Sequence, residues 1–196
     1  IKKEIETYSA KDDFKAALII ICEGIEIYLK RILIFLKTKY SDKKELIDLI
    51  SIVPLYPANT FKEALQSILI INSLLWMSDL PLIGLGRLDE VLYYYYINDL
   101  KKGKLSKEES ERLITAFIKS LHKDYNYKSN VLPGDTGQVI VLGGNGPNNE
   151  YNGNELTLLF IDIMKRIKLP DPKIVLRISS KTPEHIWKQS IELLGE

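Results

Sequence analysis

The sequence is poor in the residues that most often carry chemistry. Cys22 is the only cysteine among 196 residues, so an intramolecular disulfide and a cluster of metal-binding thiolates are both excluded. Such cysteine usage is typical of a reducing compartment, and we predict a cytoplasmic protein. The only two histidines, His122 and His185, belong to no metal-binding or catalytic-triad motif. We therefore predict no metal site.

An excess of charge of one sign is also missing. The 27 basic and 26 acidic residues leave a net charge of +1, which creates no field that would recruit nucleic acid or an anionic membrane. The longest apolar stretch, residues 64–77, contains four polar side chains and is too short to cross a bilayer. We therefore predict that the protein binds neither nucleic acid nor a membrane.

Helical periodicity is abundant in the first part of the chain. Apolar residues recur at three- and four-residue steps through 12–37 and indicate a long helix. A short helix is expected over 42–51, and a third begins at Thr60 and ends near Met77, with Glu63 as the expected reciprocal partner of the Thr60 cap. We expect residues 12–77 to form a helical region.

The remainder, residues 78–196, reads as strands that alternate with helices. Apolar runs near 80–85, 138–143 and 173–178 predict three buried strands, with helices between and after them. This order indicates an α/β fold with a parallel or mixed sheet. Three short strands are too few to close a barrel, so we interpret the chain as a slice of a larger structure.

Three features are candidates for function, each with a plainer alternative. The glycines of residues 143–146 favour an ordinary strand-to-helix loop over a phosphate cradle, because their spacing matches no nucleotide-binding motif. The four tyrosines of 93–96 favour packing; with Leu88, Leu92 and Tyr95 on the buried line, Tyr96 is expected on its flank. Arg177, in an apolar strand, requires a partner: a structural ion pair or a ligand carboxylate.

Five segments in order resemble conserved blocks of the glycyl radical enzyme superfamily, the pyruvate formate-lyase and glycerol/diol dehydratase group. The blocks are the D-F-K-A-A-L helix opening, P-A-N-T-F-K-E-A-L-Q, L-G-R-L-D followed by Y-Y-Y-Y, Q-V-I-V-L-G-G with N-E-L-T, and L-P-x-P with R and T-P-E. They lie at residues 13–24, 57–66, 85–105, 138–157 and 169–184. The resemblance covers nearly the whole chain.

This resemblance implies a helix-rich slice of a ten-stranded α/β barrel, so that residues 1–196 form a partial pyruvate formate-lyase-like domain. In the family, a glycyl radical installed by a radical-SAM activating enzyme oxidises a cysteine to a thiyl radical that attacks a small-molecule substrate, in anaerobic metabolism. Both residues lie downstream of the T-P-E helix, and Cys22 matches neither. The expectation is a lyase fragment with no catalytic residue and no cofactor of its own, inactive alone.

The resemblance also bears on the substrate pocket. Polyol dehydratases of the family carry a His-Ser pair just before the L-G-R block, and Pro81 and Leu82 stand there in this chain. The missing hydroxyl-binding groups disfavour a polyol and favour a small keto acid or a hydrocarbon-like group. Pro81, Leu82 and Arg177 are the predicted pocket residues, with Arg177 meeting a carboxylate of an acidic substrate.

Two other functions stay open at the level of sequence. The same slice is also suited to a non-catalytic binding or assembly module, in which self-association or a complementing chain covers the open sheet edge. A small nucleotide-binding α/β protein that uses residues 143–146 is the weakest interpretation.

Overall fold

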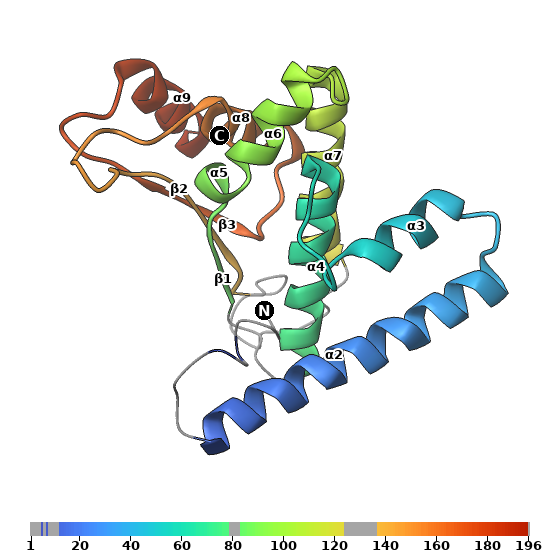
Figure 1. Ribbon diagram of the computed structural model, residues 1–196. Coiled ribbons are helices and arrows are strands. Elements are labelled where there is room, and N and C mark those ends of the chain that lie inside the picture. Colours follow the sequence, from blue (N-terminus) through green and yellow to red (C-terminus); the bar gives the residue numbers. More distant parts are fainter. Residues whose placement is uncertain (1–4, 6, 8–11, 79–82, 124–136, 196) are drawn as a thin grey trace. The chain divides into compact units, whose positions relative to one another are not determined.

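The computed structural model describes all residues except 1–4, 6, 8–11, 79–82, 124–136 and 196 (Figure 1). The chain divides into two compact units, residues 1–57 and 58–196. In the described residues, the first unit is helical, and the second holds a parallel sheet with its helices. None of the helices in the described part of the chain is both long enough and apolar enough to span a bilayer.

The first unit consists of α2 (Asp12–Lys39) and α3 (Lys44–Ile52), which contact one another. Both helices were predicted from periodicity, and α2 extends two residues further than expected. Apolar residues occur on several sides of α2, and Ile20, Ile34 and Phe14 are all exposed. Cys22 lies in this helix and is partly buried.

The second unit begins with α4 (Phe61–Met77), whose start follows the predicted capping chemistry in part. The Thr60 hydroxyl accepts a hydrogen bond from the Glu63 N–H at 3.2 Å. The Glu63 carboxylate, however, accepts from the Asn59 N–H rather than from that of Thr60, so the reciprocal bond falls one residue earlier than predicted. The cap still satisfies two backbone donors that precede or open the helix.

Three strands and five further helices complete the unit. The strands are β1 (Gly84–Arg87), β2 (Val139–Gly143) and β3 (Lys173–Arg177). The helices are α5 (Leu88–Val91), α6 (Tyr93–Lys101), α7 (Lys107–Lys123), α8 (Glu155–Ile167) and α9 (Glu184–Leu194). Pro183 is the N-cap of α9, and Glu184 is its first helical residue.

The sheet is parallel, in the order β1-β2-β3. Strands β2 and β3 were predicted in place to within a residue. Strand β1 begins at Gly84, later than the predicted run, whose residues 80–82 lie outside the described part of the chain. The pairing of β1 with β2 is irregular, because Gly84 pairs with Val139 and Arg87 with Val141.

Helices cover one face of this sheet much more than the other. Ile140 and Leu142 of β2 are fully buried in the core, together with Phe117 of α7 and Phe160 of α8. On the opposite face, Val141 pairs in register with Val175, which is 45% exposed. Since parallel strands are normally covered on both faces, an apolar surface is left open here.

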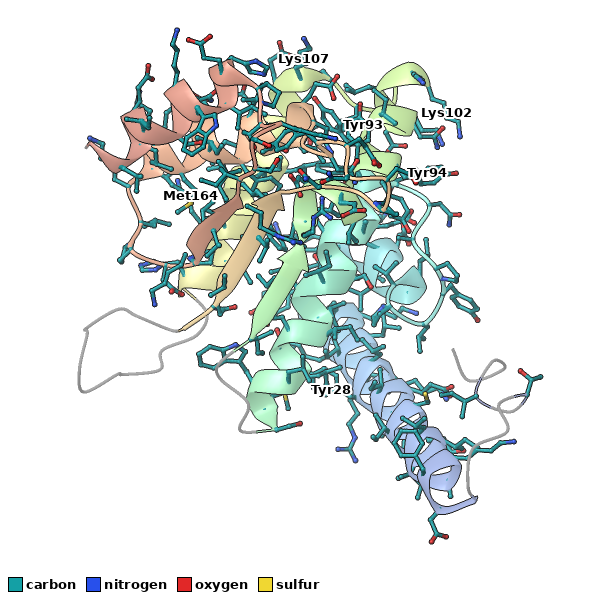
Figure 2. All side chains as sticks on the ribbon, turned by 90° about the vertical axis from the view of Figure 1, so that its left-hand side faces the viewer. Tyr28, Tyr93, Tyr94, Lys102, Lys107 and Met164 are labelled. Atoms are coloured by element: carbon teal, nitrogen blue, oxygen red, sulfur yellow. The ribbon has the colours of Figure 1, made fainter. Side chains whose placement is uncertain are left out.

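The tyrosines of α6 are arranged differently from the prediction. Tyr96 is the buried one, at 4% exposure, whereas Tyr95 is only partly buried. The reason is the spacing: Leu88, Leu92 and Tyr96 follow one another at four-residue steps along one helical line. Tyr94 points outward and is exposed (Figure 2).

Candidate functional site

The carboxyl ends of the three strands form one edge of the sheet, because parallel strands all end on the same side. Arg87 ends β1, Gly143 ends β2 and Arg177 ends β3. Gly143 and Arg177 are direct partners in the register. In open parallel sheets this edge is where ligands bind, so it is the candidate site of the chain.

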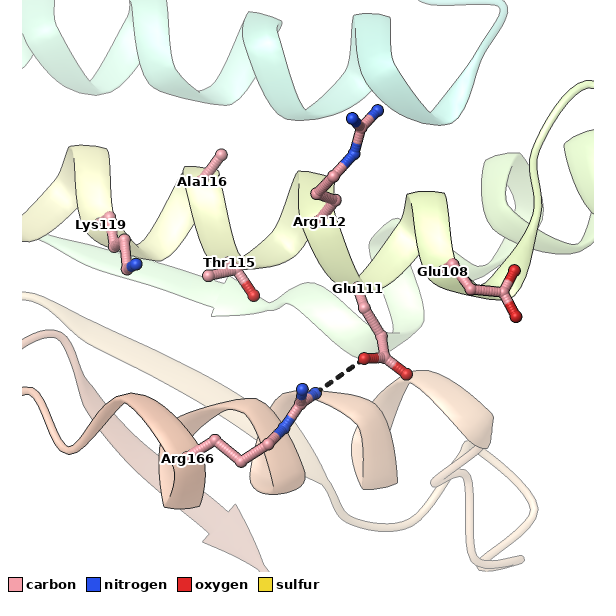
Figure 3. Close-up of a pocket in the computed structure, with 7 residues that line it drawn as sticks. All are labelled: Glu108, Glu111, Arg112, Thr115, Ala116, Lys119 and Arg166. Atoms are coloured by element: carbon pink, nitrogen blue, oxygen red, sulfur yellow. Dashed lines mark hydrogen bonds and ion pairs between the residues drawn. The ribbon is translucent and has the colours of Figure 1, made fainter.

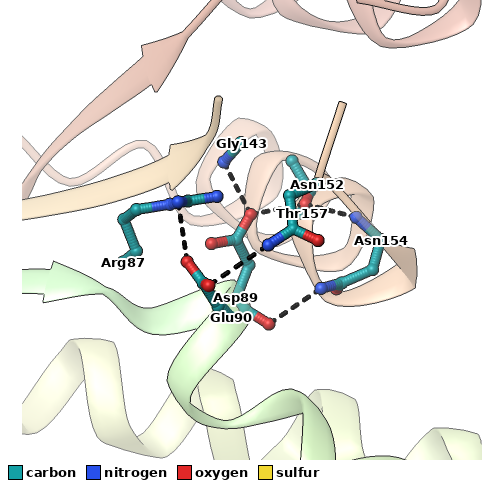
Figure 4. Close-up of polar contacts among 7 residues, drawn as sticks. All are labelled: Arg87, Asp89, Glu90, Gly143, Asn152, Asn154 and Thr157. Carbon is teal, nitrogen blue, oxygen red and sulfur yellow. Dashed lines mark hydrogen bonds and ion pairs between the residues drawn. The ribbon is translucent and has the colours of Figure 1, made fainter. Parts of the chain in front are cut away.

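Asp89, in the short helix after β1, is the centre of a polar cluster at this edge (Figure 4). Its Oδ2 accepts a hydrogen bond from the Gly143 N–H and another from the Thr157 hydroxyl, both at 2.6 Å. The Asn154 side chain donates to the Asp89 backbone carbonyl at 2.9 Å. One carboxylate therefore ties together β2, α5 and the first turn of α8.

Asp89 is fully buried. Burial raises the pKa of its carboxyl group, because a charged carboxylate loses its water. The hydrogen bonds from Thr157 and Gly143, and the nearby charge of Arg87, act in the opposite direction and favour the ionised form. The net pKa is raised, so burial outweighs these partners.

Arg87 forms an ion pair with Glu90 at 2.7 Å, and its side chain is 19% exposed. The other oxygen of the Glu90 carboxylate accepts a hydrogen bond from the Asn152 amide at 3.2 Å. These contacts bind the end of β1 to the loop before α8, alongside the Asp89 cluster (Figure 4).

Two glycines at the end of β2 allow the side chains of Tyr151, from the following loop, and Arg177, from β3, to approach the backbone closely. Gly143 and Gly144 have φ of 63° and 92°, in the region that disfavours L side chains. A Cβ on Gly143 would lie 2.7 Å from the Tyr151 hydroxyl, and one on Gly144 would lie 3.1 Å from the Arg177 Cβ. Arg177 therefore lies across Gly144, and Tyr151 lies against Gly143.

The loop after Gly144 folds back upon itself. Asn145 and Tyr151 form an antiparallel bridge, and the N–H of Gly146 bonds to the carbonyl of Glu150 at 2.8 Å. The start of α8 is capped by the side chain of Asn154. Because these donors are engaged within the chain, residues 143–146 form an ordinary connecting loop, which is the interpretation that the sequence favoured over a phosphate cradle.

The structure locates only one of the three predicted pocket residues. Arg177 is exposed at the end of β3, and its guanidinium contacts no ion-pair or hydrogen-bond partner among the described residues. Pro81 and Leu82 lie outside the described part of the chain. In the described ranges, no group of three or more His, Cys, Asp or Glu side chains is placed to hold a metal ion.

A surface pocket of about 370 Å³ lies between α7 and α8, away from the strand ends (Figure 3). Its lining mixes acidic and basic side chains, and Arg166 contacts Glu111 at 2.9 Å within it. This mixture favours no ligand of a single charge, so we do not place function here.

The cluster around Asp89 was not predicted as a site. Asp89, Asn154 and Thr157 were recognised only as members of two motifs, L-G-R-L-D and N-E-L-T. Asp89 is 54 residues from Gly143 and 68 from Thr157, so nothing in local spacing indicates that they meet. The signal that could have found them is that both motifs follow predicted parallel strands, whose carboxyl ends share one edge.

A family model and several known proteins match most or all of this chain. A family model described as "Pyruvate formate lyase-like" matches residues 1–196. The 4-hydroxyphenylacetate decarboxylase glycyl radical subunit of Clostridioides difficile is 27% identical over 194 residues, which is 91% of this chain and 22% of that protein. The isethionate sulfite-lyase of Nitratidesulfovibrio vulgaris is 26% identical over 196 residues, covering 91% of this chain and 24% of the enzyme.

Solved structures share the fold. A structure on 1,2-propanediol dehydration in Roseburia inulinivorans aligns with a TM-score of 0.85 at 23% identity, over 98% of this chain and 27% of its own. The B12-independent glycerol dehydratase of Clostridium butyricum aligns with a TM-score of 0.82 at 23% identity, with the same coverage. The chain thus spans about a quarter of the length of the proteins it matches, and its helices and three parallel strands correspond to a fragment of their barrel fold.

Proposed function

Because the chain belongs to the pyruvate formate lyase-like family, we propose that it forms part of the barrel of a glycyl radical enzyme of the lyase type. Such an enzyme cleaves a C–C or C–X bond of a small substrate, and the radical supplies the hydrogen-atom abstraction that starts the reaction. We place the radical residues outside 1–196, together with a radical-SAM activating enzyme as partner. The role of this chain is to bind and orient the substrate.

The observation that carries this proposal is the open face of the sheet. Helices bury Ile140 and Leu142 on one face, while Val141, Val175 and Arg177 occupy the other. Among the described residues, this parallel sheet is open on one face and has no further strand at either edge, which fits one sector of a closed barrel with that face directed inward. Arg177 is then a cation at the carboxyl edge of an apolar interior.

We propose that the substrate carries an acidic group, which Arg177 binds, while Pro81 and Leu82 supply an apolar wall. A guanidinium without a partner is suited to two parallel hydrogen bonds with a carboxylate. The names of three relatives are compatible with an acid: 4-hydroxyphenylacetate, isethionate and trans-4-hydroxy-L-proline each bear an acidic group. Propanediol and glycerol, named for two structural neighbours, do not.

The test uses the complete protein that contains these residues, prepared without oxygen together with its activating enzyme. A glycyl radical signal in electron paramagnetic resonance would establish the radical class, and its absence after successful activation of a control enzyme would refute it. Small carboxylates and sulfonates are then compared with their neutral analogues as substrates. We expect turnover of acids and little turnover of glycerol or propanediol.

Arg177→Gln tests the acid-binding role separately from the radical. Loss of a charge-assisted hydrogen bond of about 1.5 kcal/mol or more corresponds to a rise of about tenfold or more in KM for the acidic substrate. The matched control is Arg112→Gln, which removes an exposed arginine of α7 that pairs with Glu109. Equal KM values for wild type and Arg177→Gln, with the radical signal intact, would remove Arg177 from the pocket.

A non-catalytic binding or assembly module is the second candidate, and the same open sheet supports it. No described strand pairs with the outer edges of β1 and β3, and an outer edge of this kind is able to pair with a strand of another chain. The coding sequence next to these residues separates the two functions: a downstream cysteine loop and glycine motif indicate the enzyme, whereas their absence indicates the module. In the second case the module is expected to self-associate or to bind a complementing chain.

A further inference from the structure

Three side chains at the strand ends hold polar atoms that are buried without a partner. They are Oδ1 of Asp89, Nε and Nη2 of Arg87, and the hydroxyl of Tyr151. Each of these residues forms no other hydrogen bond through those atoms within the described part of the chain. A buried polar atom left unpaired costs about 1–3 kcal/mol, so three such residues in one place call for a ligand.

The three residues converge on the end of β2. Gly143 donates its N–H to Asp89, and a Cβ on that glycine would meet the Tyr151 hydroxyl at 2.7 Å. Arg87 lies two residues before Asp89 on the neighbouring strand end. Burial raises the pKa of the Tyr151 phenol; the charge of Asp89 raises it further, and that of Arg87 lowers it. The three residues are therefore neighbours at the end of β2, close enough for their charges to interact.

The charges exclude most kinds of ligand. Arg87 is the only cation of the cluster, and it is already paired with Glu90, so Asp89 and Glu90 leave an excess of negative charge that repels an anion. A metal ion needs several acceptor atoms, but Oδ1 of Asp89 is the one unpaired carboxylate oxygen of this cluster. The unpaired groups of the other two side chains, Arg87 and Tyr151, are able to donate hydrogen bonds. What fits is a neutral oxygen that both donates and accepts.

We propose that Asp89, Arg87 and Tyr151 together form a binding site for one hydroxyl oxygen. The hydroxyl donates to Oδ1 of Asp89 and accepts from Arg87, from Tyr151 or from both, so that a single atom joins α5 to β1, to the loop before α8 or to both. In the protein without substrate this oxygen is a water molecule. A hydroxyl group of a substrate is the other source of the same chemistry. The site does not depend on the radical reaction.

A crystal structure of the complete protein, at a resolution that shows ordered water, tests the site directly. We expect one oxygen within hydrogen-bond distance of Asp89 Oδ1 and of at least one of the two donors. A second crystal soaked in glycerol separates the sources: a retained water identifies a structural water, and its replacement identifies a site for a ligand hydroxyl. If the three side chains instead contact other protein groups or have no ordered oxygen near them, the proposal is wrong.

Tyr151→Phe tests the same site in solution. Tyr94→Phe is the matched control, because the same atom is removed from an exposed tyrosine. Loss of one hydrogen bond in the network is expected to lower the melting temperature by about 2–4 °C for a domain of this size, against no change for Tyr94→Phe. The bound oxygen should also be lost or displaced in crystals of Tyr151→Phe. Unchanged melting and an unchanged oxygen in that variant would take Tyr151 out of the site.

Discussion

Arg87 and Arg177 are the last residues of the two strands that flank β2, yet they differ in burial and in ion pairing. Arg87 is mostly buried and forms an ion pair with Glu90 beside the hydrogen bonds of Asp89. Arg177 is exposed and lies across Gly144 with no ion pair or hydrogen bond to any described residue. Two arginines at one sheet edge therefore differ in whether they form an ion pair within the described part of the chain.

This difference separates a structural strand end, at Arg87, from the strand end at Arg177 that we propose binds the substrate. The contacts of Asp89 join β2 to two helices and hold the backbone at Gly143 in place. Arg177 contributes little to that framework, and its charge remains available to a ligand or to another part of the protein. A cation that is left unpaired beside a rigid support is a suitable device for binding an acid.

Asp89→Ala is expected to have the largest effect on the structural end. The substitution leaves the Gly143 N–H and the Thr157 hydroxyl without their acceptor in a buried place, so stability should fall by about 3 kcal/mol. Urea unfolding of the complete protein measures it. The control is Asp162→Ala, which removes a half-exposed ion pair with Arg166 and should change stability by less than about 1 kcal/mol. Similar losses of unfolding free energy in both variants would show that the hydrogen bonds of Asp89 stabilise the fold no more than a surface ion pair does.

Gly143→Ala is expected to push Tyr151 and the end of β3 at Arg177 away from the end of β2. Gly103 is the matched control, because its φ of 66° is nearly the same while nothing lies within 4 Å of its Cβ position. Both alanines carry the strain of a positive φ, but only the one at Gly143 collides with Tyr151 and Arg177. We expect Gly143→Ala to be about 2 kcal/mol less stable than Gly103→Ala in the same unfolding assay. Equal stabilities would mean that the glycine is needed only for its backbone angle.

Replacing each arginine by glutamine compares the two ends directly. Arg87→Gln breaks an ion pair that is buried on the arginine side only and is expected to cost about 1 kcal/mol of stability, whereas Arg177→Gln should change it by less than about 0.5 kcal/mol. The difference is the smallest of the three effects, so melting curves of both variants are best recorded in one experiment. A larger loss for Arg177→Gln would show that its role is structural.

The framework of the chain could be predicted because it depends on local patterns. The three-to-four-residue periodicity predicted α2, the capping residue Thr60 marked the start of α4, and the apolar run before Gly143 predicted β2. The recognised motifs placed these elements in a barrel family, which the family model and the fold comparisons confirm.

The cluster around Asp89 could not be predicted, because it depends on distances between segments far apart in the sequence. An aspartate in a helical turn after a strand resembles any solvated carboxylate until Gly143 and Thr157 are brought to it. Tyr96 was placed on the flank for a related reason: periodicity alone does not say which of two adjacent tyrosines meets the core. The predicted roles of Pro81, Leu82 and Arg177 stay predictions.

The irregular pairing of β1 has a consequence for which way Arg87 faces. From Gly84 to Arg87 the strand uses three residues where β2 uses two, from Val139 to Val141. Side chains alternate between faces at every residue, so this single extra residue decides the face on which Arg87 emerges. In a regular ladder that starts at the same pair of Gly84 and Val139, Arg87 would stand opposite Leu142, and its guanidinium would be directed toward the face that holds Ile140 and Leu142. The one extra residue of β1 thus determines the face of the sheet on which the Arg87 side chain lies.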